Sequence, residues 1–204
     1  MNKSNAQKYI TVIAMLLVVI GSLIRYYILN DSFKVQDAIE KEFYMLNESV
    51  DICENKCNDF DMHPGWSFKI IDSEIYEFDE FCKKYNLSEI YLDNTPKILE
   101  VNLKLTNISN ELNSIRINFF EVVGIDWYTT LNYELTHYAN SIFFENCEEE
   151  NMGLALYPNT SFEIKMIYNL NEWQFSKEKY KNLNKEKMYF ELTILPVNKL
   201  IEFR

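Results

Sequence analysis

Glycine and histidine are both scarce in this sequence of 204 residues, with four and two copies respectively. So few glycines exclude a glycine-rich phosphate-binding loop, and none stands in the Gly-x-Ser-x-Gly motif of serine hydrolases. The two histidines, His63 and His137, lie in a proline turn and in an aromatic segment, without a partner at the spacing of a catalytic or zinc motif. The sequence therefore predicts that the protein is not an enzyme and has no catalytic, cofactor-binding or metal-binding residues.

A calcium-binding motif is also absent, and paired carboxylates, although abundant, are expected to be surface charge. The segment that starts at Asp59 begins like an EF-hand loop, but Pro64 occupies its sixth position and Ile70 its twelfth, where glycine and glutamate are required. The acidic run at 148–150 predicts a solvated loop tip. Acidic side chains are thus expected on the surface rather than in a site.

Positive charge is scarce outside the N-terminus. Residues 1–30 hold three of the 20 basic side chains and none of the 31 acidic ones, so the remainder has 17 basic against 31 acidic groups, a net charge of −14. This field repels polyanions, so nucleic acid is excluded as a partner. It also disfavours flat docking on an anionic lipid surface.

One long apolar run is present, at residues 9–29, with Arg25 as its only residue of fixed charge. As a helix it would rise about 31 Å, which matches the hydrocarbon core of a bilayer. Tyr9 at one end and Tyr26 and Tyr27 at the other suit the membrane interfaces, and Arg25 is near enough to the headgroups to reach them. A cleaved signal peptide is the competing interpretation, but no small-x-small cleavage site follows the run. The sequence predicts a transmembrane signal-anchor that contacts membrane lipid.

The charges around this helix indicate its orientation only weakly. Lys3, Lys8 and the α-amino group favour a cytoplasmic N-terminus, but Arg25, Lys34 and Lys41 nearly balance them. A short basic segment that leads into an apolar run is typical of a signal-anchor, so we expect a single-pass protein of the cell membrane with its C-terminal domain outside the cytoplasm. The predicted division is a tail at 1–8, the anchor at 9–29, a connector with a cysteine-containing loop at 30–65, and a β domain at 66–204.

Alternation of apolar and polar residues predicts the strands of that domain. It is clearest at 97–107 and 161–170, and at 67–78 it slips once at Ile71, which predicts a bulge. Further strands are expected at 42–46, 127–131, 188–195 and 199–203, and at 115–123, which we expect to pair with 97–107 as a hairpin. In the turns between these strands, asparagine, which tolerates the left-handed conformation, is expected to take the place of the scarce glycine.

Two short helices are predicted between the strands. Residues 79–86 place Phe81, Cys82 and Tyr85 on one face, and Ser176 is a suitable N-cap for a basic helix at 177–184. Six to eight short strands with only small helices between them indicate a mainly β, antiparallel sandwich.

Four stretches resemble a bacterial family of unknown function. They are SFKIIDSEIYEFDEFCKKYNLSE, PKILEVNLKLTNIS, GLALYPNTSFEIKMIYNL and MYFELTILPVNKLI. The resemblance runs from about Trp66 to the C-terminus. Members of that family are membrane-anchored, immunoglobulin-like (telokin-like) sandwich domains, mainly from low-GC Gram-positive bacteria. The resemblance implies that fold and a surface location, and it implies no catalytic residues.

The cysteines allow more than one state. Cys53, Cys57, Cys82 and Cys147 are an even number, so disulfides are expected in an exported domain, with three possible pairings. Reduced thiols are the alternative, and a metal site at Cys53 and Cys57 is the weakest interpretation, because no second ligand pair stands at zinc spacing.

The predicted function is a non-enzymatic binding module at the cell envelope, with an envelope or membrane protein as candidate partner. The aromatic candidates for contact are Tyr76, Trp127, Tyr128 and Tyr138, although such residues are more often core than interface. Two alternatives stay open: an envelope hydrolase with an unrecognised site, and an accessory subunit whose anchor pairs with another helix at Gly21-Ser22.

Overall fold

The computed structural model describes residues 19–22, 25, 40–52, 64–87, 96–117, 120–140, 153–193 and 197–204, and the chain divides into two compact units, 1–40 and 41–204. In the first unit, residues 19–22 and Arg25 are helical and exposed. The other residues of the predicted anchor, with Tyr9, Tyr26 and Tyr27, lie outside the described part. No helix formed by described residues is long and apolar enough to cross a membrane. The anchor therefore stays a prediction.

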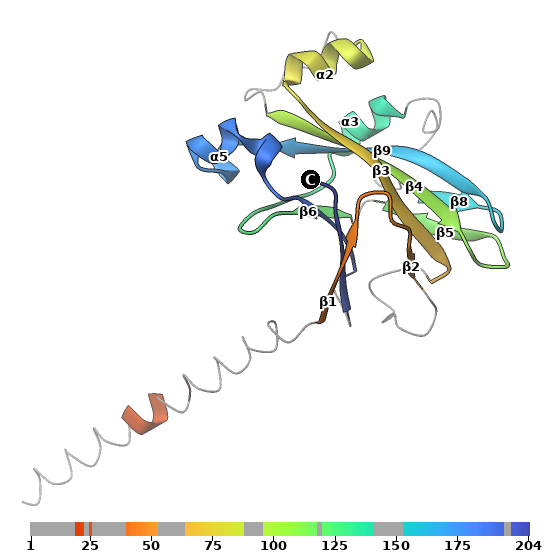
Figure 1. The fold of residues 1–204 in the computed structure, drawn as a ribbon, viewed down its shortest axis with the longest axis horizontal. Coiled ribbons are helices and arrows are strands. Elements are labelled where there is room, and N and C mark those ends of the chain that lie inside the picture. Colours follow the sequence, from red (N-terminus) through yellow and green to blue (C-terminus); the bar gives the residue numbers. More distant parts are fainter. Residues whose placement is uncertain are drawn as a thin grey trace, which may run out of the picture. The chain divides into compact units, whose positions relative to one another are not determined.

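The second unit consists mainly of antiparallel β-sheet (Figure 1). A five-stranded sheet has the order β1 (Glu40–Met45), β11 (Val197–Glu202), β10 (Tyr189–Thr193), β6 (Glu121–Val123) and β7 (Tyr128–Thr129). A four-stranded sheet has the order β2 (Val50–Ile52), β3 (Trp66–Tyr76), β4 (Lys97–Asn107) and β9 (Ser161–Leu170). A separate ladder joins β5 (Asn113–Arg116) to β8 (Gly153–Leu156).

The helices are few and short. They are α2 (Phe78–Tyr85), α3 (Tyr133–Ala139) and α5 (Lys177–Lys181), with the 3-10 turns η3 (Glu172–Gln174) and η4 (Leu183–Lys185). The prediction of a mainly β, antiparallel fold with short helices is confirmed. The helix α3 was not predicted.

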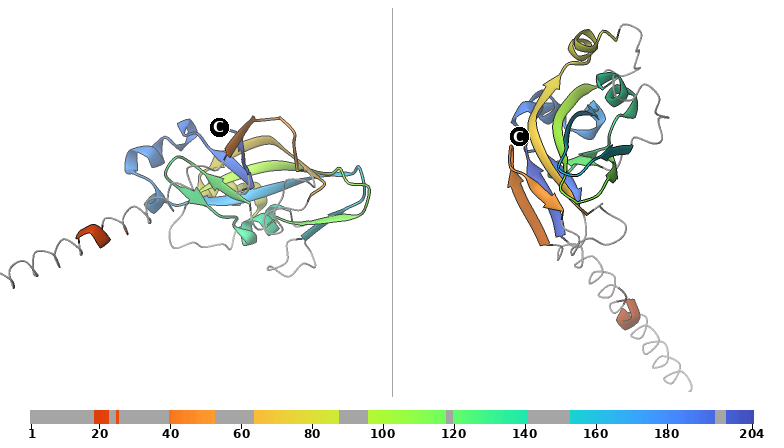
Figure 2. Two further views of the ribbon diagram at one scale, coloured as in Figure 1. Left: turned by 90° about the horizontal axis from the view of Figure 1, so that it is seen from below. Right: turned by 90° about the vertical axis from the view of Figure 1, so that its right-hand side faces the viewer.

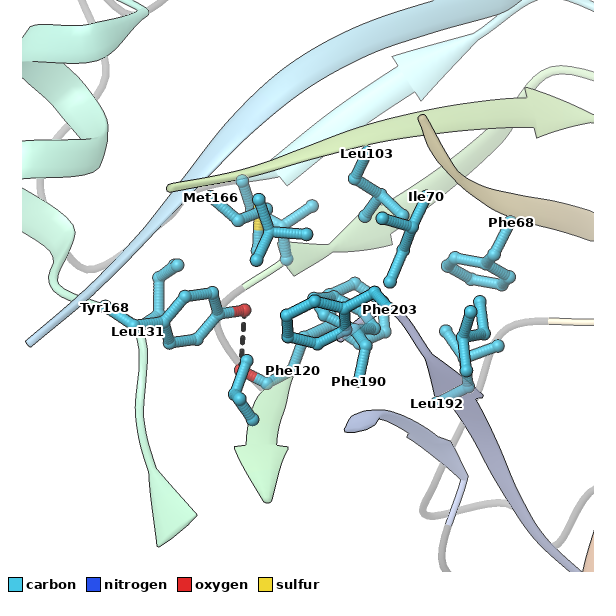
Figure 3. Packing of buried hydrophobic residues seen from close by; sticks show 14 of the residues in the cluster. Phe68, Ile70, Leu103, Phe120, Leu131, Met166, Tyr168, Phe190, Leu192 and Phe203 are labelled. Carbon is cyan, nitrogen blue, oxygen red and sulfur yellow. Dashed lines mark hydrogen bonds between the residues drawn. The ribbon is translucent and has the colours of Figure 1, made fainter. Parts of the chain in front are cut away.

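The main core lies between the two larger sheets (Figure 3). Phe68, Leu103 and Met166 come from the four-stranded sheet and meet Phe120 and Phe190, and all five side chains are at most 1% exposed. The aromatic rings of this core contact one another edge to face or tilted, with centroids 5.4 Å apart for Phe68 and Phe120 and 5.3 Å for Phe120 and Phe190. Burial of the apolar surface of these rings is the main source of the free energy that holds the two sheets together.

Strand periodicity placed several elements correctly. The strand β4 has the predicted bounds, and the register of β3 against β4 shifts between Ile70 and Asp72, where the bulge was expected. Asparagine takes the left-handed turn conformation at Asn47, Asn86 and Asn159, also as expected.

The predicted hairpin between 97–107 and 115–123 is wrong. The strand β4 pairs with β3 and β9, whereas 113–116 pairs with β8 and 121–123 pairs with β10 in the other sheet. The predicted strand is in fact two, and β4 is already flanked on both edges by long strands, so no edge is left for its neighbour in sequence.

A second cluster packs on the outer face of the four-stranded sheet. The helix α2 follows β3 at one end of the sheet (Figure 2), and α3 lies beside β9. Phe81 of α2 and Leu135 of α3 bury Ile98 and Ile167 on that face. Ile98 lies on the face of β4 opposite to Val101, and the helices shield it there from water.

The free edge of β9 is closed by the segment 129–140 rather than by another strand. The side chain of Asn140 accepts from the Lys165 N–H (3.1 Å) and donates to its carbonyl (2.8 Å). The hydroxyl of Thr136 accepts from the Ile167 N–H, at 3.1 Å, and that of Thr129 donates to the Asn169 carbonyl, at 2.9 Å. Side chains thus satisfy backbone groups that would otherwise invite another chain to pair.

Replacement of Asn140 with alanine should lower the free energy of unfolding by about 2–3 kcal/mol, because it leaves the partly buried N–H and carbonyl of Lys165 without partners and removes a buried bond to the Thr136 carbonyl. Chemical denaturation of the domain measures this loss. Asn182→Ala is the matched control, since it removes only an exposed bond to the Glu178 carbonyl and should cost well under about 1 kcal/mol. Equal losses for both variants would contradict the proposed role of Asn140.

Candidate functional site

An open groove lies beside β7, between the segment 126–132 and the turn that follows β9. Its volume is about 650 Å³, within the usual range of ligand-binding clefts. A second hollow of about 510 Å³ shares Asn171 and Trp173 with it and continues toward Pro96 and Tyr180. The residues that line the first hollow, which we call the aromatic groove, are Asp126, Trp127, Tyr128, Thr129, Thr130, Leu131, Asn132, Asn169, Asn171, Trp173 and Gln174.

Two large aromatic side chains of the groove are open to solvent. Trp173, in η3, is 80% exposed, and Tyr128, on the edge strand β7, is 62% exposed. Trp127 is different: it is only 7% exposed, and its ring packs edge to face against Phe175, with centroids 5.0 Å apart. The groove therefore combines a packed aromatic floor with exposed rings available for contact.

A tight turn between β6 and β7 sets the position of Trp127. The N–H of Gly124 donates to the Trp127 carbonyl at 2.8 Å, which closes the turn. The indole lies so close to Gly124 that a Cβ at this position would come within 2.2 Å of the ring nitrogen. A glycine is needed here because any side chain would displace the floor of the groove.

The polar residues of the groove are held by hydrogen bonds within the protein. The Gln174 amide donates to the Tyr128 carbonyl at 2.9 Å and accepts from the Asn171 N–H at 2.7 Å. The side chain of Asn132 donates to that of Asn169 at 3.0 Å. Because these bonds join η3 to β7 and the N-cap of α3 to β9, the lining is fixed before any ligand arrives.

The aromatic groove carries little net charge. Its one carboxylate, Asp126, is paired with Lys179, whose ammonium also lies 3.5 Å from Glu186. The hydrogen bond to Asp126 raises the pKa of Lys179, although partial burial opposes the shift. The rest of the lining consists of amides, hydroxyls and apolar groups.

The structure separates the four predicted contact aromatics. Tyr128 and Trp127 both line the groove, whereas Tyr76 packs toward Phe81 of α2 and Tyr138 lies on α3. Sequence reasoning missed Trp173, the most exposed of the groove aromatics. A tryptophan between Glu172 and Gln174, just after a strand, was the available signal.

The cysteines do not form a site in the described part of the chain. Cys82 of α2 is a free, partly buried thiol, so this residue has the reduced state that was the alternative to a disulfide. Burial raises the pKa of this thiol. Cys53, Cys57, Cys147 and His63 lie outside the described residues. Among the residues that the structure does describe, no group of three or more histidine, cysteine or acidic side chains is placed to hold a metal ion.

Two carboxylates oppose each other elsewhere in the five-stranded sheet. Glu121 of β6 is the cross-strand partner of Glu191 of β10, and neither lines the two hollows. Burial raises the pKa of Glu121, and the charge of Glu191 raises it further. The amide of Asn198 donates to Glu191 at 2.8 Å, which stabilises the charge on that side of the pair.

Glu121→Gln should stabilise the domain by about 0.5 kcal/mol at pH 7, because it removes one of two like charges that face each other across strands. The pKa of Glu121 is higher in the folded than in the unfolded chain, so the charged form destabilises the fold above the folded pKa. Below the unfolded value, near 4.3, both states are protonated and the gain of the variant should vanish.

Denaturation of both proteins at several pH values measures this difference. Glu111→Gln, at an exposed position, is the control and should show no such pH dependence. A gain that persists unchanged at pH 4 would show that charge is not its cause.

Comparison with known proteins gives a family and two weak structural likenesses. The family described as Domain of unknown function (DUF5028) matches residues 41–199. A conserved hypothetical protein from Bacillus anthracis is similar with a TM-score of 0.42 and 11% identity, over 77% of this chain and 98% of that one. An uncharacterized beta-sandwich protein from Clostridium difficile 630 is similar with a TM-score of 0.39 and 8% identity, over 81% and 97%. No curated protein matches the chain.

Proposed function

The chain belongs to the family described as Domain of unknown function (DUF5028), and we propose that its folded unit is a non-enzymatic binding module of the cell envelope. The family match spans nearly all of the compact unit 41–204, so the aromatic groove lies inside the family domain. The observation that carries the proposal is the exposure of Trp173 and Tyr128 at a groove whose polar lining is already fixed.

Exposed aromatic rings at a groove favour binding over a purely structural role. A tryptophan that is 80% exposed contributes little to folding, because most of its apolar surface stays in water. Tryptophan and tyrosine are the side chains that most often carry binding energy when a partner buries them. Trp127, which lines the same groove and packs against Phe175, supplies the rigid support that such a contact needs.

The chemistry of the groove favours binding over catalysis. Of the described residues in its lining, one is a carboxylate, Asp126, which is already paired with Lys179, and none is a histidine or a cysteine. General acid–base catalysis needs a proton donor or acceptor that is available to the substrate. The opposed carboxylates Glu121 and Glu191 do not line this groove.

We assign the module to the outer face of the cell membrane on the basis of its sequence. The apolar run at 9–29 has the length of a membrane span, and the resemblance to membrane-anchored, immunoglobulin-like domains of Gram-positive bacteria supports the same location and the same type of sandwich. Protease added to intact, wall-stripped cells should then remove the domain without lysis. Digestion only after lysis would overturn this orientation.

Binding of envelope material by the full chain tests the function. The protein, in detergent, should retain a component of the native envelope, and Trp173→Ala should lose most of that retention because it removes the main exposed ring. Tyr157→Ala is the matched control, since Tyr157 is 72% exposed but does not line the groove. Retention that is the same for wild type and Trp173→Ala would refute the groove as the binding site.

A further inference from the structure

We propose that the ligand of the aromatic groove is an uncharged carbohydrate chain, an inference that rests on the binding function proposed above. It follows from four properties of the groove: exposed ring faces, amide-rich lining, near neutrality, and strand edges that are already closed. Each property narrows the class of ligand independently.

Exposed rings suit the faces of sugars. A pyranose ring carries apolar patches of C–H bonds on its faces and hydroxyls around its rim, so it gains by stacking one face on an indole or a phenol ring. Trp173 and Tyr128 offer such surfaces, at 80% and 62% exposure. They come from different elements, η3 and β7, so the groove presents more than one stacking surface.

The polar lining matches a rim of hydroxyls. Among the described residues, the side-chain amide nitrogens of Asn169 and Asn171 have no protein acceptor, although the oxygen of each amide is engaged: that of Asn169 accepts from Asn132, and that of Asn171 accepts from the Gln174 N–H. Thr130 adds an exposed residue with a hydroxyl. Amides and hydroxyls donate and accept, as sugar hydroxyls do, and none of them demands a charged partner.

Charge excludes the main ionic alternatives. Among the described residues that line the aromatic groove, Asp126 is the one acid and is neutralised by Lys179, and no lysine or arginine is present to hold a phosphate, sulfate or carboxylate. The net charge of −14 outside residues 1–30 also repels anionic polymers. A neutral polymer needs no cation in the groove and is not repelled by the negative charge of the protein.

The sheet edges argue against an extended peptide that adds as a strand. At β7 the Tyr128 carbonyl is occupied by the Gln174 amide, at 2.9 Å. At β9 the backbone of Lys165 is occupied by the Asn140 side chain. Strand addition depends on free backbone groups at an edge, and these are taken.

The second hollow indicates that the ligand is a chain rather than a single sugar. Asn171 and Trp173 line both hollows, so a ligand stacked on Trp173 has room to continue on either side. The second hollow adds the aromatic residues Phe175 and Tyr180, and its two charged lining residues, Glu172 and Lys177, carry opposite charges. A linear oligosaccharide that places one unit on Trp173 fits this arrangement.

Titration with defined sugars tests the inference. The full chain is kept in a detergent without a sugar headgroup, and tryptophan fluorescence and calorimetry follow the addition of chitohexaose, cellohexaose or neutral polysaccharide from the native envelope. An oligogalacturonate and a proline-rich peptide serve as the anionic and peptide probes. We expect saturable binding of a neutral glycan that Trp173→Ala weakens about tenfold or more.

Two further variants separate stacking from a general loss of structure. Trp173→Phe should retain most of the affinity, because a ring is kept, and Tyr157→Ala should bind like the wild type. The inference is overturned if no neutral glycan binds, if Trp173→Ala binds as tightly as the wild type, or if only the anionic or peptide probe binds. Retention of envelope protein that depends on Trp173, without glycan, would sustain the binding function and reject the carbohydrate.

Discussion

Phe190→Ala should lower the free energy of unfolding by about 3–5 kcal/mol, the largest single effect that we expect in this domain. Phe190 is fully buried in β10, a central strand of the five-stranded sheet. Its ring lies 5.3 Å from Phe120 and 6.4 Å from Tyr168, whose phenol donates to the Phe120 carbonyl at 3.3 Å (Figure 3). Truncation leaves a cavity where three aromatic rings from both sheets meet.

Urea denaturation followed by fluorescence measures this loss, and Phe43→Ala is its matched control. Phe43 is 57% exposed on the edge strand β1, where its ring packs edge to face against Tyr189, with centroids 5.6 Å apart. That change should cost about 1 kcal/mol or less, because the exposed ring leaves no enclosed cavity. Similar losses for the two variants would mean that the aromatic cluster is not the centre of stability.

Lys84→Met should destabilise the domain by about 1–3 kcal/mol, because it leaves the carboxylate of Glu100 under-compensated beneath α2. The Glu100 side chain is 8% exposed and lies on the outer face of β4. The Lys84 ammonium lies 3.2 Å from both of its oxygens, and the Tyr85 hydroxyl donates to it at 2.9 Å. Burial lowers the pKa of Lys84, but the bonds to Tyr76 and Glu100 outweigh it and raise the pKa overall.

A double-mutant cycle isolates this pair. Glu100→Gln removes the charge but keeps an acceptor for Tyr85, so the combination with Lys84→Met should recover most of the loss. Lys83→Met is the control in the same helical turn; it changes the charge of the helix end without touching Glu100 and should cost about 0.5 kcal/mol or less. Strict additivity in the cycle would show that the two side chains act independently.

Several strands and helix ends could be predicted from the local order of apolar and polar residues. The strand β4 alternates so regularly that its bounds were predicted without error, and the slip at Ile71 marked the bulge of β3. The helix α2 carried its own signals, with Glu77 and Glu80 forming a capping box and Asn86 closing the end in a left-handed conformation. Patterns of period two or 3.6 and cap residues act within a few residues, so the sequence displays them directly.

The strand pairings needed the tertiary structure. Residues 113–116 follow β4 closely and look like its hairpin partner, yet they pair with β8, about 40 residues further along the chain. The pairing partner of 113–116 depends on which strands already occupy the edges of β4, namely β3 and β9. A short stretch of sequence does not contain that information.

The aromatic groove shows the same division. The sequence pointed to Trp127 and Tyr128 as aromatics of interest, but it did not distinguish a buried ring from an exposed one. Trp173 is 44 positions after Thr129 in the sequence, yet it lines the same groove. Two hydrogen bonds hold the segments together: the Gln174 amide donates to the Tyr128 carbonyl, and the Thr129 hydroxyl donates to the Asn169 carbonyl. Contacts between distant segments created the groove.

The long strands, the bulge, the capped helix and the asparagine turns could be predicted from local sequence, because each depends on side-chain periodicity or on backbone preferences of single residues. The strand order, the closed edge of β9 and the proximity of Trp173 to Tyr128 depend on the tertiary fold. Several segments of the chain can pair with the same strand edge or pack on the same sheet face. Which arrangement forms depends on the free energy of the whole fold relative to the alternatives.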